Sequence, residues 1–255
     1  MAYKDYVQIY NVMDSAGITI DDDRVTQITK IADWINSNFG DIVTADTESD
    51  KRVRVLDNKV RAGFGWGGKN AETENFGYKY ISSSSTDYTR LNSYTQDYPI
   101  ETLGLFICRS GENFVMDFIN LSSTDYYSTQ PYFIHFTASM DDETKHICML
   151  AYDTSSARAL SWYTIAENTI ATSYTKGDNS GLNGYNNYGL GKTLLTKFTP
   201  PYFNLIADDL YKIYGIIPDT REIFELNGQK YLSLKYAQNN TKNNYNYAGF
   251  ALKLD

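Results

Sequence analysis

Cysteine, histidine and proline are scarce in this 255-residue sequence, which contains two, two and five of them. Two cysteines are too few for the disulfide framework of a small secreted domain. Apolar runs such as Leu105–Cys108 fall far short of the ~20 residues of a membrane span. Residues 1–6 also lack the pattern of a signal peptide. We therefore expect a protein that is made in a reducing cytoplasm and does not enter a membrane.

Positive charge is also in short supply, because 23 Lys and Arg face 31 Asp and Glu, a net charge of -8. An acidic surface repels nucleic-acid phosphates, which disfavours general DNA binding. One basic cluster remains, and aromatic residues beside such cations can hold single strands. A solvated or subunit-contacting face is the simpler interpretation of it. The cluster consists of Lys51, Arg52, Arg54, Lys59 and Arg61, followed by Phe64 and Trp66.

Tyrosine is the abundant residue: there are 23, beside 12 Phe and 3 Trp. Six of them lie in three short polar stretches, two of which also contain asparagine. Tyrosine gives a large contact area at small entropic cost, and asparagine gives adaptable hydrogen bonds. Such stretches suit a surface that meets another protein or a sugar, although compositional bias also contributes. They are Tyr126-Tyr127, Tyr185–Tyr188 and Asn243–Tyr247.

Residues 24–39 carry the pattern of an amphipathic helix. Aspartates at 21–23 would cap its start, and Gly40 stands where glycine commonly ends a helix. We expect Trp34 to pack at the edge of the apolar stripe. Residues 3–13 predict a shorter segment with Tyr6, Ile9, Tyr10 and Met13. The apolar stripe of the longer helix is Val25, Ile28, Ala32, Ile35 and Phe39.

Beyond about residue 50, apolar and polar residues alternate with the period of a strand. Val53 and Val55 alternate with arginines and predict a hairpin that turns at Asp57-Asn58. Asn227-Gly228 is the strongest hairpin signal in the chain. The further strands are expected at 103–109, 113–121, 132–138, 146–152, 158–166, 221–226, 229–236 and 247–254.

Between these strands the sequence predicts other structure. Residues 63–68 are expected to be irregular, and 82–99 and 176–191 to be polar loops. Residues 205–214 predict one short helix. Regular alternation of strands and helices is missing, which argues against a doubly wound fold.

We therefore expect a mainly β, β-rich α+β protein. Its strands would form an antiparallel β-sandwich or barrel with an N-terminal helix and long polar loops. Residues 1–50 would be a helical segment packed on a β-rich domain of residues 51–255.

Two glycine-rich motifs could suggest catalysis, but both depart from the required pattern. Gly189–Thr193 resembles the end of a phosphate-binding loop, but Asn186 replaces the first glycine and Pro200-Pro201 follows closely. We therefore favour a glycine-rich surface loop. Gly177–Gly181 superficially resembles a serine nucleophile loop, but Asn179 breaks the spacing, and nothing places a base beside Ser180.

Metal and acid chemistry have only weak candidates. A tetrahedral zinc site would need Cys108, His135, His146 and Cys148 together, without the usual close cysteine pair. We favour a buried Cys148 and histidines in or near the core. Two acidic pairs suit glycoside hydrolysis in principle, but acids in solvated turns are commoner. These acidic pairs are Asp208-Asp209 and Asp141-Asp142. A calcium-loop pattern opens at Asp46, Glu48 and Asp50, but Lys51 stands where that loop requires glycine. We expect no catalytic, cofactor-binding or metal-ligating residue.

The C-terminal ~35 residues resemble the ends of structural proteins of tailed-bacteriophage particles. The resemblance lies in the Asn227-Gly228 hairpin, Tyr231–Leu234 and Phe250–Asp255. It implies a non-enzymatic neck, tail or baseplate subunit of the virion, made in the host cytoplasm. Such a subunit forms a homo-oligomeric ring, contacts other virion proteins and meets packaged DNA transiently. The alternative is a carbohydrate-binding β-sandwich that uses Trp66 or the tyrosine loops.

Overall fold

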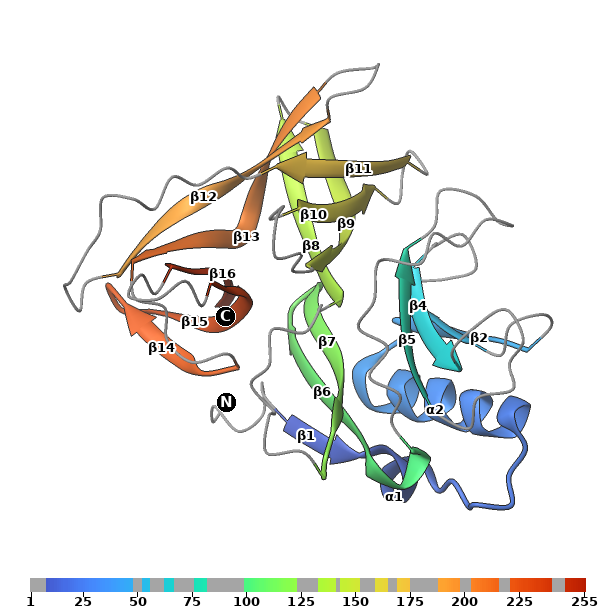
Figure 1. Cartoon of the computed structure of the whole chain (residues 1–255). Coiled ribbons are helices and arrows are strands. Elements are labelled where there is room, and N and C mark those ends of the chain that lie inside the picture. The colour runs from blue at the N-terminus through green and yellow to red at the C-terminus, as the bar shows by residue number, and fades with distance from the viewer. Residues whose placement is uncertain are drawn as a thin grey trace. The chain divides into compact units, whose positions relative to one another are not determined.

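The structure is a computed structural model of the chain (Figure 1). It describes residues 8–47, 52–55, 62–66, 76–81, 99–122, 133–140, 143–151, 159–164, 169–174, 188–197, 203–215, 221–239 and 246–255. The fold is mainly β, with antiparallel sheets and a helix near the N-terminus. This confirms the predicted fold class.

The chain divides into two compact units. Unit 1 comprises residues 1–108 and 116–126, and unit 2 comprises residues 109–115 and 127–255. The β6–β7 hairpin, which consists of Leu103–Ser110 and Asn113–Asn120, therefore contributes its tip to unit 2 and the rest to unit 1. The expected division at residue 50 stays a prediction.

Unit 1 combines helices with a four-stranded antiparallel sheet in the order β2-β3-β4-β5. Helix α2 contacts β2 and β3 of this sheet and also α1. A short strand, β1, pairs with β6. The bounds are β1 Gln8–Asn11, α1 Val12–Ala16, α2 Arg24–Phe39, β2 Val43–Asp46, β3 Arg52–Val55, β4 Ala62–Trp66, β5 Phe76–Ile81 and the 3₁₀ helix η2 Ile100–Thr102.

Helix α2 has the predicted bounds because both ends are capped. At its start, the Asp23 side chain accepts a hydrogen bond of 2.7 Å from the Thr26 N–H, and at its end the backbone of Gly40 adopts φ 84°. Its buried face is shifted slightly from the expected stripe. Val25 and Phe39 are only half-buried, and the buried residues are Gln27, Ile28, Ile31, Ala32 and Ile35.

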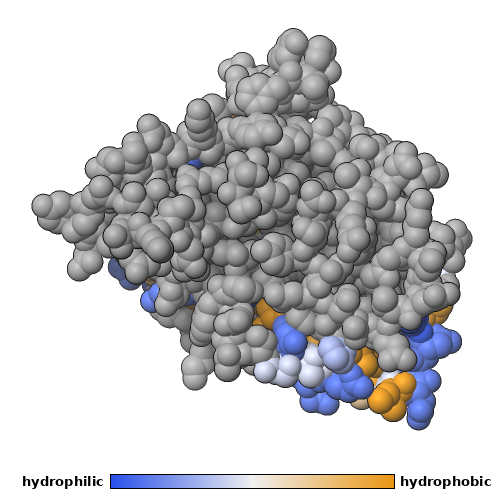
Figure 2. Space-filling model, in the orientation of Figure 1, coloured by the Kyte–Doolittle hydropathy of each residue, from blue (hydrophilic) through white to orange (hydrophobic). Residues whose placement is uncertain are grey.

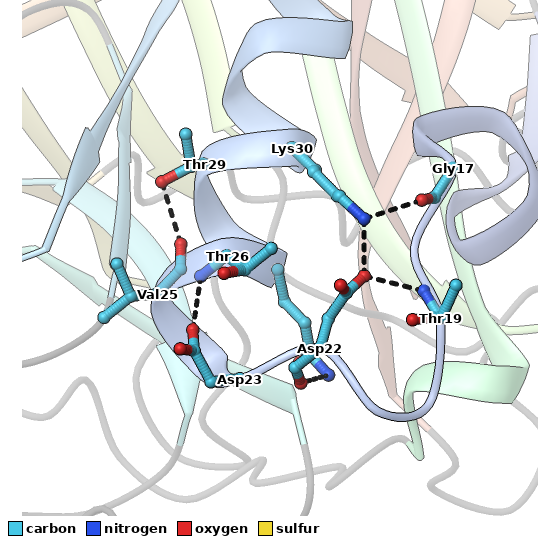
Figure 3. Close-up of polar contacts among 9 residues, drawn as sticks. Gly17, Thr19, Asp22, Asp23, Val25, Thr26, Thr29 and Lys30 are labelled. Carbon is cyan, nitrogen blue, oxygen red and sulfur yellow. Dashed lines mark hydrogen bonds and ion pairs between the residues drawn. The ribbon is translucent and has the colours of Figure 1, made fainter.

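The loop before α2 is fixed by the Asp22 carboxylate (Figure 3). One oxygen of Asp22 accepts hydrogen bonds from the Lys30 ammonium and the Thr19 N–H, each at 2.7 Å. The Lys30 ammonium also donates to the Gly17 carbonyl at 3.0 Å. The hydrogen bond from Lys30, followed by the one from Thr19, lowers the pKa of Asp22. The loop between α1 and α2 is thus tied to the first turns of α2.

Asn36 performs the same role at the other end of α2. Its amide nitrogen donates to the Val43 carbonyl at 2.8 Å, and its amide oxygen accepts from the N–H groups of Ile42 and Val43, both at 3.1 Å. Ile42 and Val43 are buried. A single half-buried side chain therefore satisfies three backbone groups that link the helix to β2.

We expect Asn36→Leu to lower the free energy of unfolding by about 2–3 kcal/mol, because it removes three hydrogen bonds to half-buried backbone at the end of the helix. Asn38→Leu is the matched control, since Asn38 lies on the same helix and makes one exposed hydrogen bond, to the Trp34 carbonyl. It should cost less than about 1 kcal/mol. Urea denaturation measures both values, and equal losses would contradict the proposed role of Asn36.

Unit 2 contains the longer part of the antiparallel sheet. Strand β13 pairs with β8, β12 and β16, and β16 pairs with β15, which pairs with β14. On the other side of β8 the order continues with β9, β10 and β11. The bounds are β8 Phe133–Met140, β9 Glu143–Ala151, β10 Ala159–Thr164, β11 Thr169–Tyr174, β12 Tyr188–Lys197, β13 Phe203–Gly215, β14 Ile223–Leu226, β15 Gln229–Asn239 and β16 Asn246–Leu254.

Three local predictions in this β-rich region are wrong. Residues 205–214, predicted as a helix, lie within β13, because neighbouring strands on both sides take up its backbone hydrogen bonds. Residues 63–66 form most of β4 rather than an irregular segment. The predicted loop 176–191 includes the start of β12 at 188–191. Strand β11 was not predicted.

The hairpin at Asn227-Gly228 is confirmed. Asn227 has φ 53° and Gly228 has φ 76°, and β14 pairs with β15 on either side of the turn. Two consecutive residues with positive φ match the right-handed twist of the flanking strands. The predicted turn at Asp57-Asn58 and the loop 82–98 lie outside the described residues.

Candidate interaction surface

Strand β1 is an end strand of its sheet. It pairs antiparallel with β6, and in the described part of the chain no second strand pairs with it. The outer side of an edge strand is where another chain can add a strand. Edge strands are commonly protected by charge, proline or a bulge, whereas β1 has the uncharged sequence Gln8-Ile9-Tyr10-Asn11.

Ile9 is the exposed apolar residue of this edge. Its side chain is 50% exposed, whereas its partner across the strands, Phe106, is 0% exposed. Residues directly opposite each other in an antiparallel pair share one face of the sheet. The buried face therefore continues to a half-exposed isoleucine at the edge. In the described part of the surface, hydrophobic residues lie among hydrophilic ones (Figure 2).

The opposite face of β1 is held by aromatic contacts. The ring of Tyr10 packs edge-to-face on Trp34 at 5.0 Å and on Phe39 at 5.7 Å, and Trp34 and Phe39 are 6.0 Å apart. All three side chains are half-buried, and burial raises the pKa of the Tyr10 hydroxyl. These contacts fix β1 on α2 and confirm that Trp34 packs at the edge of the helix stripe.

A second set of contacts lies in unit 2, around the tip of the β6–β7 hairpin. We define the hairpin tip as residues 109–115. Its Asn113 donates from Nδ2 to Asp209 Oδ2 at 3.0 Å, and the hydroxyl oxygen of Ser110 accepts from the Asp255 N–H at 3.0 Å. Lys253 Nζ lies 4.0 Å from Asp209 Oδ1. Strand β13 and the residue that follows β16 thus supply polar partners of the tip.

His135 supplies a third contact to the tip, from β8. Its Nδ1 lies 2.7 Å from the Glu112 carbonyl oxygen, and its ring stacks on Phe114 at 5.2 Å with an interplanar angle of 20°. Because a carbonyl only accepts, Nδ1 carries the proton in this contact. The side chain is 6% exposed. The expectation that this histidine lies in or near the core is therefore confirmed.

The phosphate-loop candidate Gly189–Thr193 does not form a loop. Residues 188–197 are β12, and Gly189 and Gly191 pair with Tyr214 and Lys212 of β13. Backbone N–H groups in such a ladder cannot wrap phosphates. The favoured surface-loop interpretation is also wrong for these residues. Gly177–Gly181 lies outside the described residues.

The cysteine and histidine candidates lie on three strands. Cys108 of β6 is buried, and this burial raises the pKa of its thiol to about 12. The thiol is therefore protonated at neutral pH. In β8 and β9, the register places Cys148 opposite His135 and His146 opposite Thr137. Within the described residues, no group of three or more His, Cys, Asp or Glu is arranged to hold a metal ion.

The acidic candidates are dispersed. Asp208 and Asp209 lie within β13 rather than in a turn, and each accepts a hydrogen bond from another strand: Asp208 from the Ser139 hydroxyl at 3.0 Å, and Asp209 from Asn113. Asp46 ends β2 and is buried. Glu48, Asp50 and Asp141-Asp142 lie outside the described residues.

The basic cluster is only partly described. Arg52 and Arg54 lie on β3 on either side of the buried Val53, which pairs with Phe64 of β4. Trp66 ends β4. Lys51, Lys59 and Arg61 and most of the three tyrosine-asparagine stretches lie outside the described residues.

Sequence reasoning did not identify β1 or the partners of the hairpin tip. Residues 3–13 were expected to form one segment, but β1 ends at Asn11 and α1 begins at Val12. The uncharged run at 8–11 is a local signal that could have revealed an edge strand. The tip contacts join residues 96 and 145 positions apart, so no local signal announces them.

Comparison of the chain with known proteins identified no relative. A family-model scan, a search of curated proteins and a search of solved structures found no match to this chain. Of the helices that the structure describes, none has the length and apolar character needed to cross a membrane.

Proposed function

We propose that the chain is a non-enzymatic structural subunit that assembles with copies of itself. The observation that carries the proposal is Ile9, half-exposed on an uncharged edge strand and directly opposite the buried Phe106. Covering this residue would extend an existing apolar face. A neighbouring subunit that pairs with β1 supplies both the cover and the backbone partners.

The proposed setting is a ring in a bacteriophage virion, at the neck, tail or baseplate. The resemblance of the C-terminal residues to virion structural proteins supports this setting. In a ring each subunit uses two different surfaces, so that contacts close by rotation. Other virion proteins are the further partners, and an excess of acidic residues would let packaged DNA pass without sticking.

Substitution of Ile9 tests the self-assembly. We expect the wild-type chain to be oligomeric by sedimentation velocity, and Ile9→Asp to weaken association at least about tenfold, because a charge replaces an apolar contact. Ile206→Asp is the matched control: Ile206 is also 50% exposed but lies on β13 within the sheet of unit 2.

Two results would count against the proposal. A wild-type chain that stays monomeric at every concentration would remove self-assembly. Equal weakening by Ile9→Asp and Ile206→Asp would show that association does not depend on the β1 edge. Circular dichroism on both variants verifies that each remains folded.

A further inference from the structure

The register of the four-stranded sheet in unit 1 gathers arginine and tyrosine on one of its faces. Partners in an antiparallel sheet lie directly opposite each other and share a face, and so do positions two residues apart along a strand. Two rows of positions therefore cross the sheet from β2 to β5 on the same face. They are Asp46, Arg52, Gly65 and Tyr78 in the first row, and Thr44, Arg54, Gly63 and Tyr80 in the second.

The opposite face of this sheet is apolar and packs on α2. It includes Val43 and Val53, which are 3% and 0% exposed, and α2 contacts the strands of both (Figure 1). Phe64, directly opposite Val53, belongs to the same face. Among the helices and strands that the structure describes, none other than α2 packs extensively on this sheet. The two rows consequently lie on the face away from the helix.

The register changes which aromatic residues accompany the basic cluster. In the sequence, Phe64 and Trp66 follow the cluster directly, but the register assigns Phe64 to the apolar face. Tyr78 and Tyr80, which no sequence motif singled out, are the aromatic residues of the two rows and share a face with the arginines. Only the strand pairing reveals this combination.

Each row has the same arrangement of three chemical groups. A guanidinium on β3 can bind a phosphate, and a phenol ring on β5 can stack on a base. Between them, a glycine of β4 carries no side chain, so that a ligand can lie close to the backbone. A carboxylate stands only in the first row, where Asp46 is opposite Arg52. The second row, with Arg54 and Tyr80, therefore has the stronger attraction for an anion.

The spacing of the rows matches that of an extended nucleotide chain. Strands β3 and β5 are two strand spacings apart, roughly 10 Å, which is comparable to the reach of one nucleotide from its phosphate to its base. Successive rows are two residues apart, about 7 Å, and successive phosphates of an extended single strand are separated by a similar distance. One nucleotide per row can thus place its phosphate at the arginine and its base at the tyrosine.

We propose that this face of the sheet binds single-stranded nucleic acid, with phosphates on Arg52 and Arg54 and bases stacked on Tyr78 and Tyr80. In a duplex the bases stack on one another and are not available to the tyrosines, so a single strand is the favoured ligand. The contacts to phosphate make the binding sensitive to salt, and the net charge of -8 keeps it weak. The site goes beyond the proposed self-assembly and does not require it.

Fluorescence anisotropy with a labelled oligothymidylate of about 20 nucleotides tests the site. We expect saturable binding at about 50 mM salt that weakens as the salt concentration rises. Tyr80→Ala and Arg54→Gln should each lower the affinity about tenfold, because the first removes a stacking ring and the second a phosphate contact. Tyr80→Phe should bind like the wild type, because it retains the ring. A duplex of equal length should bind more weakly than the single strand.

Lys79→Gln is the matched control for Arg54→Gln. Lys79 lies on β5 between the two tyrosines and opposite Phe64, so its position belongs to the other face of the sheet. The substitution removes one positive charge from the same sheet but none from the two rows. It should change the affinity less than about twofold. Circular dichroism verifies that each variant remains folded.

Four results would overturn the inference. The first is a wild-type chain without saturable binding at low salt, and the second is equal weakening by Lys79→Gln and Arg54→Gln, which indicates general charge attraction. The third is binding of a sulfated oligosaccharide as tight as that of the oligothymidylate and equally insensitive to Tyr80→Ala. The fourth is an Arg54→Gln variant that changes the sedimentation coefficient but not the affinity, which indicates a subunit contact. A monomeric wild-type chain that binds in the expected pattern would support this site and remove only the proposed self-assembly.

Discussion

Cys108 should react about 1,000-fold more slowly with iodoacetamide at pH 8 than an unperturbed thiol, from its protonation alone. Burial raises its pKa from 9.0 to about 12, and the thiolate is the reacting species. The experiment uses a Cys148→Ser variant, in which Cys108 is the remaining thiol. Mass spectrometry after timed alkylation measures the rate.

The sign of the pH dependence follows from the same shift. Between pH 9 and about 12 the folded protein keeps the Cys108 proton and the unfolded chain loses it, so this thiol lowers stability as pH rises through that interval. Alkylation in denaturant provides the reference rate. A native rate equal to that reference would contradict the burial of Cys108.

Phe136→Ala should lower the free energy of unfolding by about 3–5 kcal/mol, the usual cost of deleting a fully buried phenylalanine. Phe136 is 0% exposed and lies in β8, opposite Ile147 of β9, which is also fully buried. Truncation would remove a large apolar surface and leave a cavity that two paired strands cannot close. Guanidinium denaturation followed by circular dichroism measures the loss.

Thr137→Ala is the matched control for this truncation, because Thr137 is the next residue of the same strand and is only half-buried. Its loss should stay below about 1 kcal/mol. Similar losses in both variants would mean that the β8–β9 pair, rather than the Phe136 side chain, responds to substitution. Such a result would place the core of unit 2 elsewhere.

The predictions that hold depend on signals within a few residues. The bounds of α2 followed from an aspartate cap and a glycine end, and the hairpin at Asn227-Gly228 followed from two residues that tolerate positive φ. The turn residues after 103–109 predicted β6, and the alternation at 247–254 predicted β16. In each case the sequence signal lies within a few residues, although the strands β6 and β16 pair with segments far away in the chain.

The predictions that fail depend on distant partners. Residues 205–214 fit a helical period, yet β12, β8 and β16 bind β13 from both sides and make it a strand. Gly189–Thr193 fits a loop, yet most of it pairs with the same long strand. Apolar periodicity alone does not separate a short helix from a buried strand.

The candidate surfaces follow the same rule. The contacts among Tyr10, Trp34 and Phe39 were predicted only in part. Trp34 was expected to pack at the edge of the helix stripe, but the strand that carries Tyr10 was not recognised. The partners of the hairpin tip, Asp209, Asp255 and His135, come from three separate parts of the chain. They become neighbours only after the sheet of unit 2 has formed.

By itself, the sequence determined the mainly β class, the long helix and the tight turn, since caps, period and turn residues act over a few positions. The tertiary structure alone decided which strand became an edge strand, which glycine-rich segment became a paired strand, and which residues bind the hairpin tip 109–115. The physical reason is that strand pairing satisfies backbone groups between segments far apart in the chain, and this gain outweighs local preference.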